Sequence, residues 1–392
     1  MAKLINLKIF KAFSDSSAIG GLLLILCVIL SLIIANTGLA SGFADFLATE
    51  IGFSTDSIHL TYPVLIWIND GLMAVFFLLV GLEIKREIVE GELSSAKQAA
   101  LPVLAAIGGV IVPAIIYSIF NTGTPTSSGW GIPMATDIAF ALGILSLLGN
   151  RVPSGLKIFL AALAIVDDLM AILVIAIFYT NELHFEYFAY AGGMFALQLL
   201  FNRLGIKNIL LYVIPGIFMW YFIHHSGIHA TIAGVLTAFT LPTTEDDTES
   251  PLEKLEHLLA NPVNFIIMPI FAIANTNITF ESGMVQGLMS SLGLGIMLGL
   301  CLGKPIGIFL MSWLSVKLKL ASLPEETNWQ HVLGLGLLGG IGFTMSIFIA
   351  LLSFNAPEIQ GEAKFAILMA SVLSGIGGFT LLKSTYKKIH TA

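Results

Sequence analysis

The sequence predicts an all-α polytopic membrane protein with twelve transmembrane helices. Of its 392 residues, 56% are hydrophobic and only 11% are charged, whereas about 25% of the residues in an ordinary soluble domain are charged. Because one membrane-spanning helix needs about 20 apolar residues, the chain has room for roughly twelve spans with their connections. These observations exclude a water-soluble fold, and the net charge of −7 provides no basic surface for nucleic acid.

Twelve apolar stretches follow one another along the chain. The first follows a segment with three lysines, as in a signal peptide, but it is too long for one and more spans follow, so we expect it to remain as a span. Cys27 and Cys301 lie far apart in apolar stretches, which predicts two buried thiols rather than a disulfide. The spans are expected near residues 17–36, 63–83, 100–120, 129–149, 155–179, 186–202, 208–224, 227–242, 262–279, 290–314, 330–353 and 363–382.

The distribution of positive charge predicts the orientation of these spans. If the N-terminus is cytoplasmic, every Lys and Arg lies in a cytoplasmic segment except Lys304, inside a span, and Lys364, near an outer boundary. Cytoplasmic loops of membrane proteins carry such an excess of Lys and Arg. An error of one span would reverse the pattern, so we predict that both termini are cytoplasmic. The outer loops without any Lys or Arg are 37–60, 121–128, 180–185 and 280–287.

Two connections have distinctive compositions. The outer segment 45–62 mixes Ile, Phe, Thr and Tyr around a Ser-Thr-Asp turn, which is compatible with a small β-hairpin or with a plain polar loop. The inner segment 245–257 is strongly acidic, and such a run is usually a solvated face.

Four ionisable residues lie where lipid is expected. Asp137 falls in the middle of the fourth span, Asp167 and Asp168 in the fifth, and Lys304 in the tenth. Each costs about 2.5–3.5 kcal/mol at the bilayer centre, or about 10 kcal/mol together, and such residues usually mark ion or proton pathways. The alternative is a structural ion-pair network, but one lysine leaves an excess of carboxylates.

Two spans contain helix breakers near these charges. The fourth contains Pro133 before Thr136-Asp137, and the eleventh contains Gly339, Gly340 and Gly342 at mid-depth. An aspartate facing the positive ends of the half-helices and a lysine facing their negative ends would offset their dipoles. Spans 3–5 and 10–12 have opposite orientations and each has a broken centre, which is typical of inverted-repeat transporters.

The chain resembles the bacterial NhaA-type sodium/proton antiporters, in six blocks that follow the family order over almost its whole length. That family is a standard example of inverted-topology repeats. The blocks are LLVGLEIKRE (78–87), PMATDIAFALG (133–143), LKIFLAALAIVDDL (156–169), SGIHATIAG (226–234), LGKPIGI (302–308) and GGIGFTMSIFIA (339–350).

The resemblance implies a role for each matching residue. Asp167 and Asp168 would form the proton and cation site, binding Na⁺ or Li⁺ as transported ions, with Lys304 paired to Asp167. The helix crossing and its charge compensation would involve Thr136, Asp137, Lys304 and Gly342, and Asp70 would lie in the outer funnel. The pH response would involve Glu83, Arg86, Glu87, His229, Glu256 and His257.

The resemblance also implies the setting. Residues 1–392 would form a single transmembrane transporter domain in the bacterial inner membrane, without a cofactor, and would pair as a homodimer through segment 45–62. It would exchange cytoplasmic Na⁺ or Li⁺ for external H⁺ electrogenically, serving sodium extrusion and pH homeostasis. Glu253 and Ala260 depart from the family pattern, where Lys and His are familiar, which puts the pH set-point in doubt.

The residues support such exchange chemically. Hard cations prefer oxygen ligands, and burial together with mutual repulsion brings carboxylate pKa values toward neutrality. Adjacent helical residues point about 100° apart, so Asp167 and Asp168 can border one cavity without sharing one face. Protons and Na⁺ can then compete for the same oxygens.

Other functions fit less well. An intramembrane aspartyl protease needs two carboxylates on separate helices, a sodium-coupled symporter needs further polar groups for its solute, and a channel would pass current without obligatory exchange. His224, His225 and His229 are the one candidate metal cluster. Zinc usually requires three or four ligands, and Ser226-Gly227 predicts a turn between spans within this cluster. A histidine that titrates near neutral pH is the better interpretation.

Overall fold

The computed structural model describes the backbone of residues 2–55, 59–180, 183–244, 249–281 and 283–391. It also describes their side chains, except those of residues 2–18, 150 and 386–391. The side chains of Lys3, Lys8, Lys11, Lys387 and Lys388 are therefore not described. Part of the acidic run 245–257 and the turn within segment 45–62 lie outside the described residues.

The chain divides into two compact units, each assembled from separated stretches of sequence. Residues 1–26, 92–171 and 278–392 form the first unit, and residues 27–91 and 172–277 form the second. The boundaries fall inside α1 (Ala2–Ala35) and α7 (Ser154–Phe178), so both helices belong to both units.

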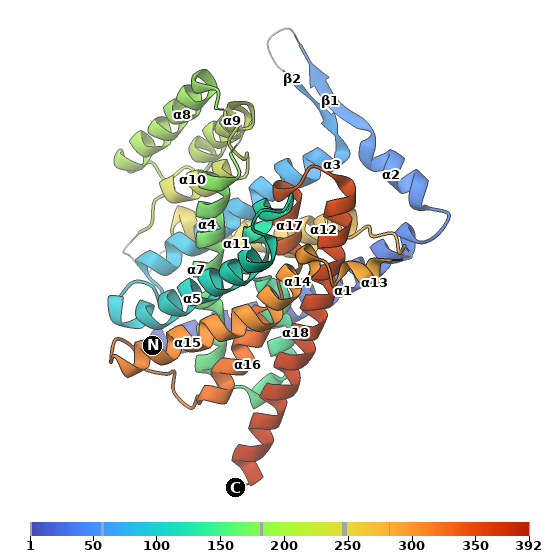
Figure 1. Ribbon diagram of the computed structural model, residues 1–392. Coiled ribbons are helices and arrows are strands. Elements are labelled where there is room, and N and C mark those ends of the chain that lie inside the picture. The colour runs from blue at the N-terminus through green and yellow to red at the C-terminus, as the bar shows by residue number, and fades with distance from the viewer. Residues whose placement is uncertain (1, 56–58, 181–182, 245–248, 282, 392) are drawn as a thin grey trace. The chain divides into compact units, whose positions relative to one another are not determined.

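The remaining elements of the first unit are all helical (Figure 1). They are α5 (Ala96–Asn121), the 3₁₀-helix η2 (Ser127–Met134), α6 (Ile138–Leu147), the 3₁₀-helix η3 (Gly149–Arg151), α13 (Met284–Gly287), α14 (Ser291–Leu298), the π-helix η5 (Gly299–Gly303), α15 (Lys304–Lys317), α16 (Trp329–Gly339), α17 (Phe343–Ser353) and α18 (Pro357–Thr391).

The second unit adds one pair of strands to its helices. Its elements are α2 (Ala40–Ala48), β1 (Glu50–Ser54), β2 (His59–Pro63), α3 (Val64–Ile66), the π-helix η1 (Trp67–Leu72), α4 (Met73–Val89), α8 (Phe185–Arg203), α9 (Leu210–Ser226), α10 (Ile232–Thr240), α11 (Pro251–Pro262), the π-helix η4 (Val263–Ile267) and α12 (Met268–Asn275).

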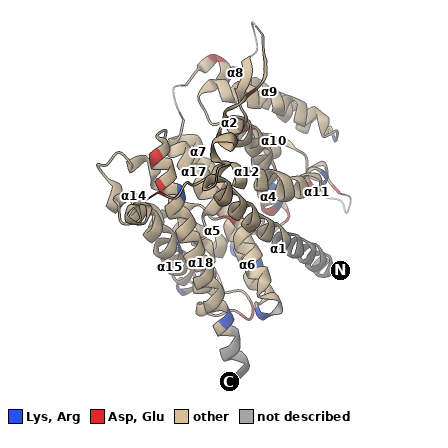
Figure 2. Ribbon diagram, turned by 90° about the vertical axis from the view of Figure 1, so that its right-hand side faces the viewer, with Lys and Arg blue, Asp and Glu red and all other residues tan. Residues whose placement is uncertain are grey.

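Helices long and apolar enough to cross a membrane dominate both units. Among the described residues, seven helices are long and apolar enough for a span. The number rises to as many as nine if each of two bent helix pairs counts as one span. Figure 2 shows the scarcity of charge, since most of the ribbon is neither blue nor red. The prediction of an all-α polytopic membrane protein is confirmed, whereas the count of twelve spans stays a prediction.

Close backbone contacts hold α5 against α15 in the first unit. A Cβ atom added at Gly108 would overlap the backbone of Gly307, and one added at Gly307 would overlap that of Gly108. Small residues at such contacts are how helices pack in lipid, where burial of apolar surface gives no driving force. This contact fixes α15, the helix that begins with Lys304.

In the second unit, α4 packs against α10 and holds its C-terminus. Lys85 Nζ donates hydrogen bonds to the carbonyl oxygens of Phe239 (2.8 Å) and Leu241 (2.5 Å). These carbonyls lie at the end of α10 and lack helical partners, and the lysine charge offsets the negative end of the helix dipole. Lys85 is therefore a C-terminal cap for α10.

Segment 45–62 contains paired backbone. β1 and β2 are antiparallel, with Glu50 opposite Pro63 and Ser54 opposite His59 (Figure 1). The residues that connect the two strands are among those not described.

Candidate functional site

Two interrupted helices meet in the first unit. The backbone is extended between η2 and α6, and the α16–α17 pair bends by 46° at its break. Asp137 N donates to Ile341 O (2.7 Å), and Thr136 Oγ1 donates to Gly339 O (2.8 Å). These bonds satisfy backbone groups that the interruptions leave without helical partners, as burial in a membrane requires.

Asp137 stabilises the N-termini of two helices with one carboxylate. Its Oδ1 accepts from Phe140 N (3.0 Å) as the N-cap of α6. Its Oδ2 accepts from Thr344 N (3.2 Å), in the first turn of α17, and from the Thr344 hydroxyl. A carboxylate at a helix N-terminus satisfies free N–H groups and offsets the positive end of the dipole.

Lys304 compensates the opposite polarity. Its side chain is fully buried at the start of α15, directly after the π-helix η5. Nζ donates to Met134 O at the C-terminal end of η2 and forms an ion pair with Asp167 Oδ2 (2.5 Å). The ammonium group of Lys304 therefore binds a helix end and a carboxylate at the same time.

The two adjacent aspartates lie on α7 beside this crossing. Asp167 is 1% exposed and Asp168 is 3% exposed. Asp167 Oδ2 is held by Lys304, whereas Asp167 Oδ1 is buried and accepts no hydrogen bond from any described residue. A buried carboxylate oxygen without a donor is costly unless a proton or a cation binds it. This arrangement can therefore bind a small hard cation or a proton.

A second cluster of charged groups lies in the second unit, at the end of α4 and on α11. Arg86 contacts Glu87 (3.2 Å) and Glu256 (2.5 Å), and Glu83 lies within electrostatic range of both Arg86 and Glu256. One cation thus faces three carboxylates. His257, predicted in the same group, is half exposed and pairs with Glu249 (2.7 Å) instead.

Asp70 lies in the π-helix η1 of the second unit, between two histidines. Asp70 Oδ2 is 3.2 Å from His224 Nδ1, and Asp70 Oδ1 is 3.6 Å from His229 Nε2. The contact with His224 was not expected from the sequence, because the π-helix changes which residues of this helix face α9. His225 lies against Tyr221 instead. No group of three metal-binding side chains occurs among the described residues.

Two further polar residues at the crossing escaped the sequence analysis. Thr344 binds Asp137, and Ser346 Oγ donates to Ile132 O (2.7 Å). The available signal was that Thr344 and Ser346 lie two and four residues after Gly342. Gly342 itself has no room for a Cβ atom, which would overlap the Ser346 side chain.

Comparison with known proteins places this site in a family. The family model described as Na⁺/H⁺ antiporter 1 matches residues 11–382. The Na⁺/H⁺ antiporter NhaA 2 of Flavobacterium johnsoniae is 72% identical over 99% of this chain and 95% of the relative. The NhaA antiporter of Flavobacterium psychrophilum is 52% identical over 97% of each chain, and that of Escherichia coli is 49% identical over 95% of this chain and 97% of its own. The chain therefore belongs to the Na⁺/H⁺ antiporter 1 family, which confirms the resemblance inferred from its sequence.

Proposed function

We propose that this protein is a Na⁺/H⁺ antiporter, a transporter rather than an enzyme, which expels cytoplasmic Na⁺ or Li⁺ in exchange for external H⁺. The observation that carries the proposal is the buried carboxylate of Asp167, with one oxygen on Lys304 and the other without a hydrogen-bond donor. Asp168 follows on the same helix and supplies further oxygens at the site. The relatives' names support the choice of ions.

Competition between ions explains the exchange. Protons and Na⁺ bind the same oxygens of Asp167 and Asp168, so a proton displaces Na⁺ outside and Na⁺ displaces protons inside. If the site faces one side at a time, through rocking of one bundle, no other coupling is needed. When more protons enter than sodium ions leave, the membrane potential also drives the cycle, with about 2.3 kcal/mol per charge for 100 mV.

The crossing keeps the site intact during this cycle. We assign charge compensation at the helix ends to Asp137 and Lys304, and backbone support to Thr136. Gly342 keeps the break of the eleventh span narrow. The spans before and after each break would form the inverted repeats 3–5 and 10–12.

The proposed topology has twelve crossings in one transporter domain of residues 1–392. The nine apolar spans counted above include each bent pair as one span. Helices α8, α9 and α10 would be three further spans, which gives twelve. This count supports cytoplasmic termini in the bacterial inner membrane, because it keeps the positive charges inside.

We assign regulation and assembly to the second unit. The pH response would lie in the carboxylates around Arg86, with His257 at its edge, and in His229 beside Asp70 at the outer funnel. The strands β1 and β2 of segment 45–62 would pair two copies as a homodimer, because strand edges readily join another chain. Together these assignments describe a transporter for sodium extrusion and pH homeostasis.

The decisive experiment measures proton movement in inverted membrane vesicles after addition of NaCl, LiCl or KCl across a range of pH. We expect proton release with Na⁺ and Li⁺ but not with K⁺, and its loss in Asp167→Asn and Asp168→Asn. Glu186→Gln, which removes an exposed carboxylate on α8, is the matched control and should retain exchange. Well-folded protein without cation-dependent proton movement at any pH would overturn the proposal and favour symport.

A further inference from the structure

The first turn of α16 is capped by a histidine. Asn328 precedes the helix, and its Oδ1 accepts a hydrogen bond from His331 N (3.0 Å). In return, Asn328 N donates to His331 Nδ1 (3.1 Å). This reciprocal pair is a capping box, in which the third residue of the helix is usually Glu or Gln. The His331 side chain is buried, with 2% of the residue exposed.

The capping bond requires a neutral imidazole. A backbone N–H group can only donate a hydrogen bond, so His331 Nδ1 has to be the unprotonated ring nitrogen. A proton on Nδ1 removes the acceptor and leaves Asn328 N without its partner. It also places a positive charge at the N-terminus of a helix, where the dipole is unfavourable for it, and it buries that charge. The intact cap is therefore incompatible with a charged His331.

A second capping box in the chain shows what the histidine changes. At the start of α11, Ser250 N donates to Glu253 Oε2 (2.7 Å), and Glu253 N donates to Ser250 Oγ (3.2 Å). A carboxylate remains an acceptor throughout the neutral range, whereas an unperturbed imidazole gains a proton near pH 6.5. The box of α16 thus depends on pH in a range where that of α11 does not.

No charged side chain balances a charge on His331 within the described part of the chain. The helix packs against α15, α18, α6 and η5, and the last two contain no charged residue. Lys317 ends α15 and Lys383 lies on α18, and each ammonium group lies over an aromatic ring (4.4 and 5.7 Å from the ring centres). Glu325 and Glu326 of the preceding loop are exposed, and burial alone acts on the imidazole.

Helix α16 connects this cap to the helix crossing. It has 11 residues, and isolated helices of this length are only marginally stable, so its first turn depends on the cap. Its last residue, Gly339, has the carbonyl oxygen that accepts from Thr136. A Cβ atom added at Gly336 would lie 2.9 Å from the Cα atom of Pro305, the residue after Lys304. A shift of α16 would therefore disturb the backbone at the crossing and beside Lys304.

We propose that His331 is a positioning residue for ion exchange, whose neutral imidazole fixes the start of α16. A proton that arrives from the cytoplasmic side releases Asn328 N, loosens α16 and weakens its support of the crossing, so exchange falls in acid. The inference rests on the proposed function and on the proposed topology. It adds a pH-responsive group in the first unit to those assigned to the second.

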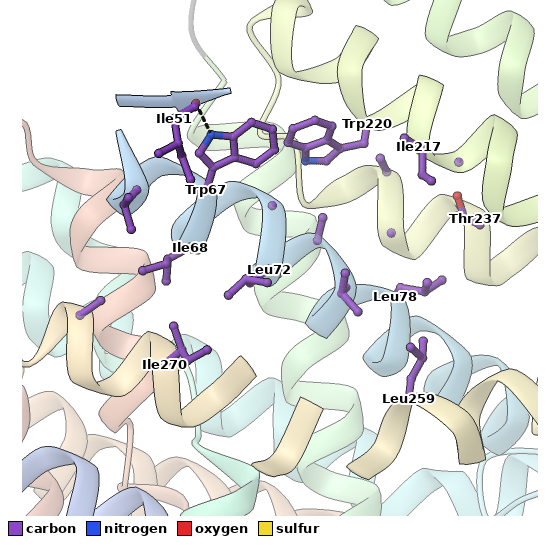
Figure 3. Close-up of a pocket in the computed structure, with 18 of the residues that line it drawn as sticks. Ile51, Trp67, Ile68, Leu72, Leu78, Ile217, Trp220, Thr237, Leu259 and Ile270 are labelled. Atoms are coloured by element: carbon purple, nitrogen blue, oxygen red, sulfur yellow. Dashed lines mark hydrogen bonds between the residues drawn. The ribbon is translucent and has the colours of Figure 1, made fainter. Parts of the chain in front are cut away.

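Trp329, the first residue of α16, reports on the cap without any transport. Its ring packs edge-on against Phe309, with 5.5 Å between the ring centres. Replacement of the other four tryptophans by Phe leaves Trp329 alone; these are Trp67 and Trp220, which stack in the second unit (Figure 3), Trp130 and Trp313. Acrylamide quenching then measures the access of water-soluble molecules to the start of α16. We expect the quenching constant to rise by about twofold from about pH 8.5 to about pH 5.5.

Variants of His331 separate titration from capping. His331→Gln keeps an acceptor at every pH, so quenching should stay low in acid. Exchange in inverted vesicles should then persist to a pH lower by about 0.5 unit or more. His331→Ala has no acceptor, so quenching should be high at both pH values. The control is His184→Gln, at an exposed histidine that makes no side-chain cap bond at the start of α8, and it should behave as the parent.

Equal quenching of the parent at both pH values would overturn the proposal, and so would an equal rise in His331→Gln. If His331→Gln does not fold, His331→Glu supplies the acceptor used in α11 and takes its place. If the Phe replacements disturb the fold, hydrogen exchange of the first amides of α16, corrected for the intrinsic rate at each pH, gives the same comparison. Quenching needs no transport, so it decides about the cap even if absent Na⁺-dependent proton movement refutes the proposed function.

Discussion

Lys304 and Asp167 form an ion pair with both side chains fully buried. Burial of a charge pair costs so much desolvation that such pairs seldom add stability, whereas removal of one partner leaves an uncompensated charge. The pair is better explained by its position, because the same lysine also holds the C-terminal end of η2. Two apolar residues in place of Lys304 and Asp167 would give the fold equal stability.

Lys304→Ala should therefore lower the stability markedly, by about 3–5 kcal/mol. It leaves the Asp167 charge buried and removes the donor to Met134 O. The double variant Asp167→Asn/Lys304→Met removes both charges and should recover most of the loss. The measurement is thermal unfolding of purified protein, with Lys317→Ala at the exposed end of α15 as the control. Wild-type stability of Lys304→Ala would contradict the role in the helix crossing.

At the scale of elements, the first unit replaces helical hydrogen bonds at two breaks by bonds between the broken helices. Asp137 is central because it caps α6 and also binds the first turn of α17. Its loss would free donors on both helices in a place that water does not reach. The two breaks should therefore depend on one another for stability.

Asp137→Ala should cost more than loss of a single ordinary cap, which is about 0.5–2 kcal/mol. Asp137→Asn should cost less, since an amide oxygen can still accept from Phe140 N. The reference is Ser95→Ala, which removes the partly exposed N-cap of α5 in the same unit. If Asp137→Ala and Ser95→Ala lower the unfolding temperature equally, Asp137 does not link the two helices.

The π-helix η1 is a second determinant at this scale. It brings Asp70 to His224 and His229, and it places Trp67 against Trp220. Periodicity arguments assume 3.6 residues per turn, and an extra residue in one turn rotates the following side chains. The predicted role of Asp70 at the outer funnel remains a proposal, but its partners could not be read from spacing.

At the scale of the whole molecule, the proposed response to pH would depend on the excess negative charge in the second unit. Glu253 completes a capping box with Ser250 at the start of α11. Burial, and then repulsion from Glu253, raise the pKa of the Glu90 carboxyl, while Arg86 opposes the shift. A raised pKa means that protonation of Glu90 favours the folded state at low pH, and that this contribution is lost as pH rises through the folded-state pKa.

Glu253→Gln should shift this balance without breaking α11, because glutamine can keep the capping box. Loss of the like charge lowers the pKa of Glu90, so the pH profile of exchange should move to lower pH. Glu90 is largely exposed, so the shift should stay below about one pH unit. Exchange in inverted vesicles gives the profile, and thermal unfolding confirms the fold. An unmoved profile would show that Glu253 does not contribute to the pH set-point.

The sequence by itself determined the membrane class, the family and the identity of the intramembrane charges. Composition excludes a soluble fold. Because a charge in lipid is costly, the sequence alone identifies the charged residues inside the spans, which are Asp137, Asp167, Asp168 and Lys304. These properties depend on residue type and order along the chain. Pairing of Lys304 with Asp167 was expected only through the family resemblance.

The tertiary structure decided which partners these residues meet. Thr344 reaches Asp137 across 207 positions of sequence, and Lys85 caps α10. Apolar periodicity indicates the lipid-compatible face of a helix, but it does not predict which helix packs beside it. Those outcomes depend on close backbone contacts between distant glycines and on local π-helical turns, neither of which leaves a periodic signal.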